Sequence, residues 1–145
     1  LWAEKEPLQY VKGLSLLKQK NYQGCINVAQ EALGKGIAPK RFYKLLGITY
    51  LYKGKLDAAA RLLEIVYEES PSDLELILAI VDTYHRNGNF KARQQFIKRL
   101  LCLKGDKPWR KYISDAAEEN NLNAYEINSS RVFKIVREGI SNLIF

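Results

Sequence analysis

Apolar residues recur at steps of three and four along most of the chain, a spacing typical of α-helices with one or two buried faces. Polar residues, glycines and prolines interrupt this pattern at intervals that suit helix ends. The pattern predicts six helices, over residues 7–20, 22–33, 40–53, 56–69, 74–87 and 90–103. It predicts two more, over residues 108–119 and from just after residue 123 to about residue 142. We therefore expect an all-α fold.

Several helix ends are marked by particular residues. Asn21 is expected to cap the second helix with its side chain. Gly54 and Gly88 stand at predicted hairpin turns. Asn123 and Glu126 have the spacing of a capping box, which places the start of the last helix directly after Asn123. The apolar stripe predicted for that helix consists of Val132, Phe133, Val136, Ile140 and Leu143.

These marks return with a period of 34 residues. The pairs Asn21-Tyr22, Lys55-Leu56 and Asn89-Phe90 are separated by this step, and so are Gly13 and Gly47. Glycine at the last two positions allows two helices to approach closely. A period of this length indicates tandem helical hairpins that pack on their neighbours and present a long surface to another chain.

The second hairpin carries the most specific set of residues: Tyr43, Leu46, Gly47, Tyr50, Ala59, Leu63 and Pro71. This set resembles the tetratricopeptide repeat (TPR), which places large, leucine, glycine, tyrosine, small, large and proline residues in this order. The first and third repeats depart from it, with Lys12 and Arg93 at positions where apolar or small residues are typical. Terminal repeats are commonly atypical because one face meets solvent or a capping helix. The resemblance covers about residues 6–107, as repeats at 6–39, 40–73 and 74–107.

The resemblance implies a single domain over residues 1–145, built as a right-handed α-solenoid with a C-terminal helical cap. Residues 108–145 are then a degenerate fourth hairpin. In such proteins the first helix of each hairpin lines a concave groove that holds peptides or helices. The positions that correspond to this lining are Tyr10, Leu14, Leu17, Arg41, Lys44, Ile48, Leu51, Tyr52, Leu78, Asp82, His85 and Arg86. The resemblance thus implies a non-enzymatic scaffold or adaptor that holds a partner protein, with Arg41, Lys44 and Arg86 favouring an acidic one.

Two further points about this groove follow from its residues: whether it can grip a carboxylate, and what can cover its apolar positions. Co-chaperone members of the family grip a carboxylate with one lysine and two asparagines, but the corresponding positions here are Tyr10, Leu14, Leu45, Glu75 and Ala79. An adaptor for the major heat-shock chaperones is therefore disfavoured. The apolar groove residues have an alternative to a foreign partner, because the C-terminal helix of the chain or a neighbouring repeat can cover them. The end Leu143-Ile144-Phe145 is either packed or the beginning of a further segment.

The chain has a formal net charge of +7, which raises the question of anionic partners. Residues 74–107 hold seven basic and three acidic residues, but the basic ones are spread around the sixth helix and are not aligned with aromatic rings. RNA binding is therefore kept as an alternative from another class. A second alternative is a structural component of a larger envelope or secretion assembly, docked by its ends or by a basic convex face that includes Lys98 and Arg99.

Catalytic and metal-binding chemistry has little support in the sequence. His85 is the one histidine, and the two cysteines, Cys25 and Cys102, are expected to be small apolar residues in helix interfaces. These residues do not form the clustered ligands that zinc requires, and no glycine-rich phosphate loop is present. We therefore expect no enzyme activity, no metal and no cofactor.

The sequence does not identify a compartment. It contains no methionine, which favours a processed form or a fragment of a longer protein. No apolar run reaches the length of about 18 to 20 residues needed to span a bilayer. The first six residues lack the basic and apolar regions of a signal peptide. Localisation and oligomeric state are thus left open.

Overall fold

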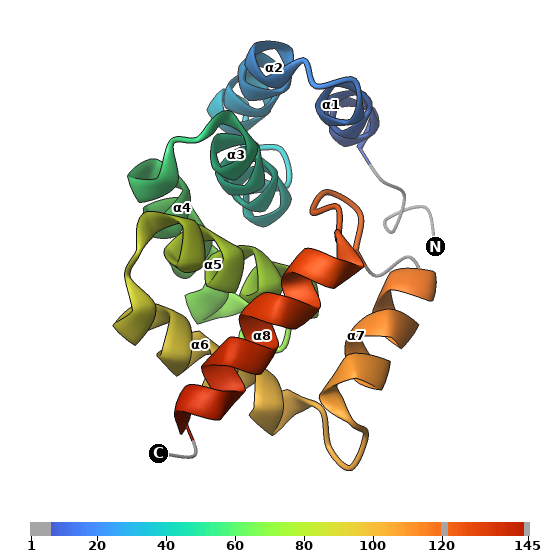
Figure 1. Ribbon diagram of the computed structural model, residues 1–145. Helices are drawn as coiled ribbons and strands as arrows, with labels where there is room; N and C mark the ends of the chain where they lie inside the picture. Colours follow the sequence, from blue (N-terminus) through green and yellow to red (C-terminus); the bar gives the residue numbers. More distant parts are fainter. Residues whose placement is uncertain (1–6, 120–121, 144–145) are drawn as a thin grey trace. The chain divides into compact units, whose positions relative to one another are not determined.

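The computed structural model describes residues 7–119 and 122–143, and in these ranges all regular secondary structure is helical. The prediction of an all-α fold is confirmed. The eight helices of the described residues are α1 (Leu8–Lys18), α2 (Tyr22–Gly34), α3 (Pro39–Lys53), α4 (Leu56–Glu69), α5 (Leu74–Asn87), α6 (Phe90–Leu103), α7 (Trp109–Glu118) and α8 (Ser129–Leu143) (Figure 1).

The predicted helix ends agree closely with the observed ones. Asn21 caps α2 by accepting a hydrogen bond from the backbone N–H of Gly24 at 3.0 Å. Gly54 and Gly88 end α3 and α5 in the left-handed conformation, with φ of 89° and 76°. The first helix is shorter than predicted, because Lys20 has a φ of 61° that no right-handed helix allows.

The chain divides into two compact units, Leu1–Val66 and Tyr67–Phe145, with the boundary inside α4. In the first unit, α1 and α2 form a hairpin, and α3 packs against both of its helices. A Cβ atom on Gly13 would lie 2.8 Å from Cδ2 of Leu45, and one on Gly47 would lie 2.8 Å from Leu63. Both distances are shorter than Cβ contacts in proteins, so glycine allows the close approach at these two helix crossings, as predicted. A single domain over residues 1–145 stays a prediction.

The core of the first unit lies where α1, α2 and α3 meet. Tyr10 of α1 meets Phe42 of α3 edge-on, with ring centroids 5.7 Å apart. Cys25 of α2 is fully buried, and its thiol lies 3.2 Å from the hydroxyl of Thr49. The first contact joins α1 to α3, and the second joins α2 to α3.

The second unit is built around α5, which is buried continuously from Leu74 to Tyr84. Its partner α6 packs along one side, and α8 contacts both helices of this hairpin. Trp109 of α7 meets Phe133 of α8 at 5.6 Å between ring centroids, so α7 lies along the other side of α8 (Figure 1).

The start of α8 differs from the prediction. The helix begins at Ser129 and is capped by Asn128, which accepts from the N–H of Arg131 at 3.2 Å. Asn123 does not start a helix, because the two N–H groups that follow it donate to the side chain of Glu75. The predicted stripe is also shifted. The buried residues of α8 are Val132, Ile135, Val136 and Gly139.

The chain end falls partly outside the described residues. Phe133, Ile140 and Leu143, which were expected in the stripe, are half-buried at its margin. Ile144 and Phe145 lie beyond the described range, so the two alternatives for the apolar end stay open.

Candidate protein-binding surfaces

The predicted groove residues are divided between the two units. The first unit holds eight of them, Tyr10, Leu14 and Leu17 on α1 and Arg41, Lys44, Ile48, Leu51 and Tyr52 on α3. The second unit holds Leu78, Asp82, His85 and Arg86 on α5.

In the first unit the apolar members are mostly packing residues. Ile48 and Leu51 have 0% of their surface exposed, and Tyr10 and Leu17 are also buried. Leu14, Lys44 and Tyr52 are half-buried, and Arg41 is exposed. The accessible part of this surface is thus more polar and more basic than the sequence prediction described.

Two aromatic contacts organise the α1/α3 surface, by which we mean Leu14, Arg41, Lys44 and Tyr52. The guanidinium of Arg41 lies over the ring of Tyr10, with 5.6 Å from its central carbon to the ring centroid. The rings of Tyr52 and Tyr22 stack at 6.3 Å with an interplanar angle of 14°. Each contact holds a side chain of the surface against a neighbouring helix.

The charged side chains of α1 and α3 are all basic. Residues 8–18 and 39–53, which form α1 and α3, include no aspartate or glutamate. Residues 7–55 as a whole hold nine basic residues and one acidic residue, Glu31. Glu31 lies on α2 and pairs with Lys35 at 3.2 Å. The remaining residues of the chain hold fourteen basic and fifteen acidic residues, so the positive net charge comes from residues 7–55.

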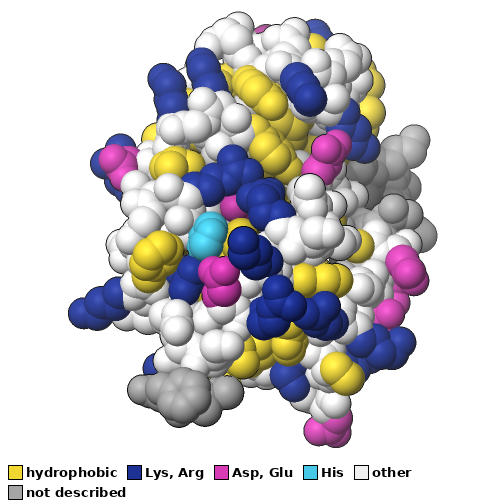
Figure 2. All heavy atoms as spheres, viewed as in Figure 1, with side chains coloured by type: hydrophobic (Ala, Val, Ile, Leu, Met, Phe, Trp, Pro, Cys, Tyr) yellow, Lys and Arg dark blue, Asp and Glu magenta, His cyan; other side chains and the backbone are white. Residues whose placement is uncertain are grey.

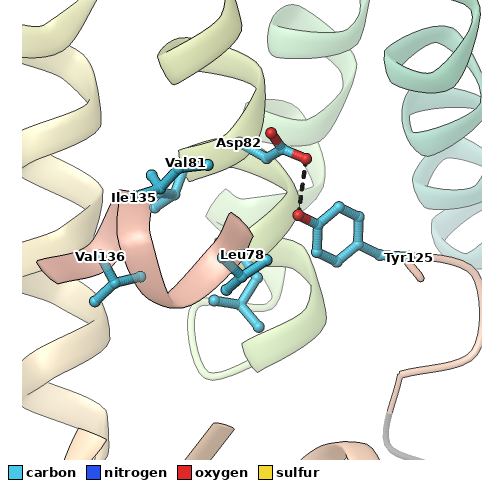
Figure 3. A pocket seen from close by; sticks show the side chains of 7 residues that line it. Leu78, Val81, Asp82, Tyr125, Ile135 and Val136 are labelled. Carbon is cyan, nitrogen blue, oxygen red and sulfur yellow. Dashed lines mark hydrogen bonds between the residues drawn. The ribbon is translucent and has the colours of Figure 1, made fainter. Parts of the chain in front are cut away.

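In the second unit the predicted groove face is covered by the chain itself. Leu78 and Val81 of α5 meet Ile135 and Val136 of α8, and Tyr125 closes the end of this crevice (Figure 3). The crevice has no space for a water molecule. Of the occupants considered for the groove, the C-terminal segment therefore covers the α5 part.

Asp82 is the polar centre of this contact. Its buried carboxylate accepts from the hydroxyl of Tyr125 at 2.8 Å, from Nη1 of Arg131 at 2.6 Å and from Nε of Arg86 at 3.0 Å. Burial lowers the pKa of Arg131, but the hydrogen bond and the charge of Asp82 outweigh it and raise that pKa above its usual value. A buried carboxylate with three donors is well compensated, so this network ties the C-terminal segment to α5.

A second carboxylate holds the backbone of the same segment. Oε2 of Glu75 accepts from the N–H of Ala124 at 2.8 Å and from the N–H of Tyr125 at 3.0 Å. The α5 face thus binds a stretch of loop backbone, a tyrosine, an arginine and an apolar helix face. Sequence reasoning placed Glu75 and Asp82 in the groove lining but missed Tyr125 and Arg131, because side chains that meet across 43 to 50 residues leave no local pattern.

His85 lies at the end of α5 in a cluster with both signs of charge. Nη1 of the buried Arg93 lies 2.9 Å from Nδ1 of His85. The pKa of His85 is lowered by burial and by the charge of Arg93, while Glu138 and Asp82 act against this change. Figure 2 shows the histidine at the surface with basic and acidic side chains beside it.

Arg93 also links this cluster to α8. Its Nε and Nη2 lie 3.3 Å and 3.2 Å from Oε1 of Gln94. Nε2 of Gln94 in turn donates to the carbonyl oxygen of Gly139 at 2.8 Å. The arginine that breaks the repeat pattern is therefore a buried packing residue, held by polar partners.

The remaining reactive side chains do not form a shared site. Cys25 is buried, and burial raises the pKa of its thiol in spite of a hydrogen bond to Thr49. Cys102 is exposed, contrary to the expectation that it fills a helix interface. Among the described residues, no group of three or more His, Cys, Asp and Glu side chains could bind a metal ion.

Comparison with known proteins assigns no relative to the chain. Neither a protein-family model nor a curated protein sequence matches it. In residues 7–119 and 122–143, every helix is too short or too polar to cross a lipid bilayer.

Proposed function

We propose that the chain is a non-enzymatic scaffold of the tetratricopeptide type, a right-handed solenoid with a C-terminal helical cap, which holds a segment of a partner protein. The observation that carries this proposal is the occupied face of α5. There the chain binds its own segment through Glu75, through Asp82 and through an apolar strip. The corresponding helix of the preceding repeat, α3, has a less covered face and is suited to hold a foreign segment in the same way.

The experiment compares partner capture by the intact chain and by two variants of α3. Tyr52→Asp changes a half-buried residue of the α1/α3 surface, whereas Tyr43→Asp changes an exposed tyrosine elsewhere on the same helix. The proposal expects Tyr52→Asp to abolish capture and Tyr43→Asp to leave it intact, with equal helicity by circular dichroism. Leu51→Asp is unsuitable because a charge at this fully buried position would destabilise the fold.

The same purified chain can be used to test the two alternative functions, a structural component of an assembly and an RNA-binding repeat. A structural component docked by its basic convex side would lose assembly on charge reversal at Lys98 or Arg99. The guanidinium of Arg99 lies over the rings of Phe96 and Tyr67, at 4.6 Å and 5.1 Å, so Lys98→Glu is the cleaner change. An RNA-binding repeat would instead give a gel shift that disappears as salt is raised.

A further inference from the structure

Three residues on one face of α1 are exposed, although the corresponding residues of the next two repeats are buried. Leu8, Val11 and Ser15 are three and four residues apart, so they form one stripe along the helix, the outer α1 stripe. Leu8 has 81% of its surface exposed and Val11 has 50%, and Ser15 is also exposed. The residues that follow at steps of 34 all have 0% of their surface exposed: Phe42, Leu45, Thr49, Leu76, Ala79 and Thr83.

The first two counterparts on α3 show what such a stripe packs against. Phe42 meets Tyr10 of α1 edge-on, with ring centroids 5.7 Å apart. A Cβ atom on Gly13 would lie 2.8 Å from Cδ2 of Leu45, so Leu45 lies directly against the backbone of α1. These two positions therefore pack on an aromatic ring and on a glycine of the first helix of the preceding hairpin.

The third counterpart reaches the second helix of the same hairpin. The hydroxyl of Thr49 lies 3.2 Å from the thiol of Cys25 on α2, and both side chains are fully buried. The stripe of α3 thus packs against both helices of one hairpin. The position of each contact specifies an aromatic residue, a glycine and a small residue on that hairpin.

We propose that the outer α1 stripe packs against a helical hairpin of a partner protein, in the way that α3 packs against α1 and α2. The partner hairpin carries an aromatic residue and a glycine on its first helix and a small residue on its second. Isolated apolar side chains are common at protein surfaces, but Leu8 and Val11 occupy positions that are buried in both later repeats. The stripe shares no residue with the α1/α3 surface, so this inference does not depend on the proposed function.

A second copy of this chain is a poor occupant of the stripe. The hairpin face that carries Tyr10, Gly13 and Cys25 is covered by α3, so a second copy does not offer it. Two α1 helices packed on each other would bring together Lys12 of both copies, which lies beside the stripe, and α1 holds no acidic residue to compensate this charge. The stripe therefore fits a hairpin of a different protein whose face is open.

The test uses a designed array of three helical hairpins as the probe, because consensus repeats of this kind are readily designed. The last hairpin of the array carries tyrosine, glycine and alanine at the positions of Tyr10, Gly13 and Cys25, and no capping helix follows it. A second probe is the same array with a capping helix over this hairpin. Binding of each probe to the intact chain is measured by fluorescence anisotropy.

The variant Leu8→Gln/Val11→Gln removes the two apolar side chains of the stripe. Its matched control is Tyr43→Gln/Ile65→Gln, which changes two other exposed apolar side chains of the first unit. All four positions are exposed, so both variants should keep the helicity of the intact chain by circular dichroism.

We expect the intact chain and the control to bind the open array equally, and the stripe variant to bind it at least about tenfold more weakly. The capped array should not bind. Failure of the open array to bind, or equal binding by the stripe variant and the control, would overturn the proposal. Sedimentation that shows a dimer of the intact chain, lost in the stripe variant, would also overturn it, because the occupant would then be a second copy. Capture through Tyr52 is measured separately, so failure of the stripe and failure of the groove are distinguishable.

Discussion

The phenolic hydroxyl of Tyr125 donates a hydrogen bond of 2.8 Å to Oδ2 of Asp82, and so joins a loop that precedes α8 to the middle of α5. Both residues are at least 99% buried. The bond lies beside the apolar contact of Leu78 with the residues of α8, as Figure 3 shows. A buried polar contact thus joins segments of the second unit that lie 43 residues apart in the chain.

Removing this hydroxyl tests the importance of the contact. Tyr125→Phe keeps the ring and leaves one oxygen of a buried carboxylate without this donor. A hydrogen bond to a charged group contributes about 1.5 to 3 kcal/mol, so the free energy of unfolding should fall by about this amount. Urea denaturation followed by circular dichroism measures this free energy.

Tyr43→Phe, at an exposed position, serves as the control and should change the free energy of unfolding by less than about 0.5 kcal/mol. Equal stability of the two variants would contradict the role of the bond.

Gly139 provides a test of the packing between α8 and α6. A Cβ atom at this position would overlap Cδ1 of Ile97 and lie 2.9 Å from Oε1 of Gln94. Gly139→Ala should therefore destabilise the chain by about 1 to 3 kcal/mol through overpacking, although alanine is the better helix former by about 1 kcal/mol. Gly34→Ala in α2 meets nothing within 4 Å and should be neutral or stabilising. Thermal unfolding of both variants measures which of the two effects is larger. A Gly139→Ala variant as stable as the native chain would show that α8 can move away from α6.

The two thiols should differ in reactivity. Cys102 is exposed, whereas Cys25 is buried with a raised pKa, so its reactive thiolate is both rare and inaccessible. A thiol reagent that absorbs light on reaction should titrate one group in the native chain at pH 8 and two in denaturant. The Cys102→Ser variant should give none and then one. Rapid native labelling of Cys25 would show that α2 and α3 open readily.

Much of this fold could be predicted because the information is local and repeated. The capping side chains of Asn21 and Asn89 and the left-handed Gly54 and Gly88 set the ends of helices whose bounds were expected. The role of Gly13 followed from its recurrence as Gly47. Such features can be recognised in a single sequence because each acts on residues close to it in the chain or recurs with the 34-residue period.

The covering of α5 could not be predicted in detail, because it depends on long-range pairing. Glu75 takes the N–H groups of Ala124 and Tyr125, so the capping-box spacing of Asn123 is present but unused. Glu75 is fully buried and needs donors for its carboxylate. Its hydrogen bonds therefore outweigh the local capping pattern of Asn123. The basic region of residues 7–55 was likewise hidden, because counting by hairpin averaged it with Glu4 and Glu6 in the first hairpin and with the acidic residues of α4 in the second. These residues determine the candidate surfaces, whose partner-binding role stays a prediction.

His85 gives the last prediction, on the pH dependence of stability. The pKa of His85 in the folded chain is below its ordinary value of 6.5, because burial and Arg93 disfavour the protonated ring. Between the folded pKa and 6.5, the unfolded chain binds more protons than the native chain. Stability from this group is therefore complete above pH 6.5 and is lost as pH falls through the folded pKa. The ring contacts α6 through Arg93, and Glu138 of α8, Asp82 and Arg131 also act on it.

The measurement compares the melting temperature of the native chain with that of His85→Gln as pH is lowered from about 8 to about 5. Glutamine can still accept a hydrogen bond from Arg93 but does not titrate in this range. Carboxylates affect both proteins alike, so the difference between the two melting temperatures isolates His85. The native chain should lose stability relative to the variant below about pH 6.5 and keep a constant difference above it. A difference that is flat, or that grows in favour of the native chain on acidification, would mean that burial and Arg93 do not hold the ring in its neutral form.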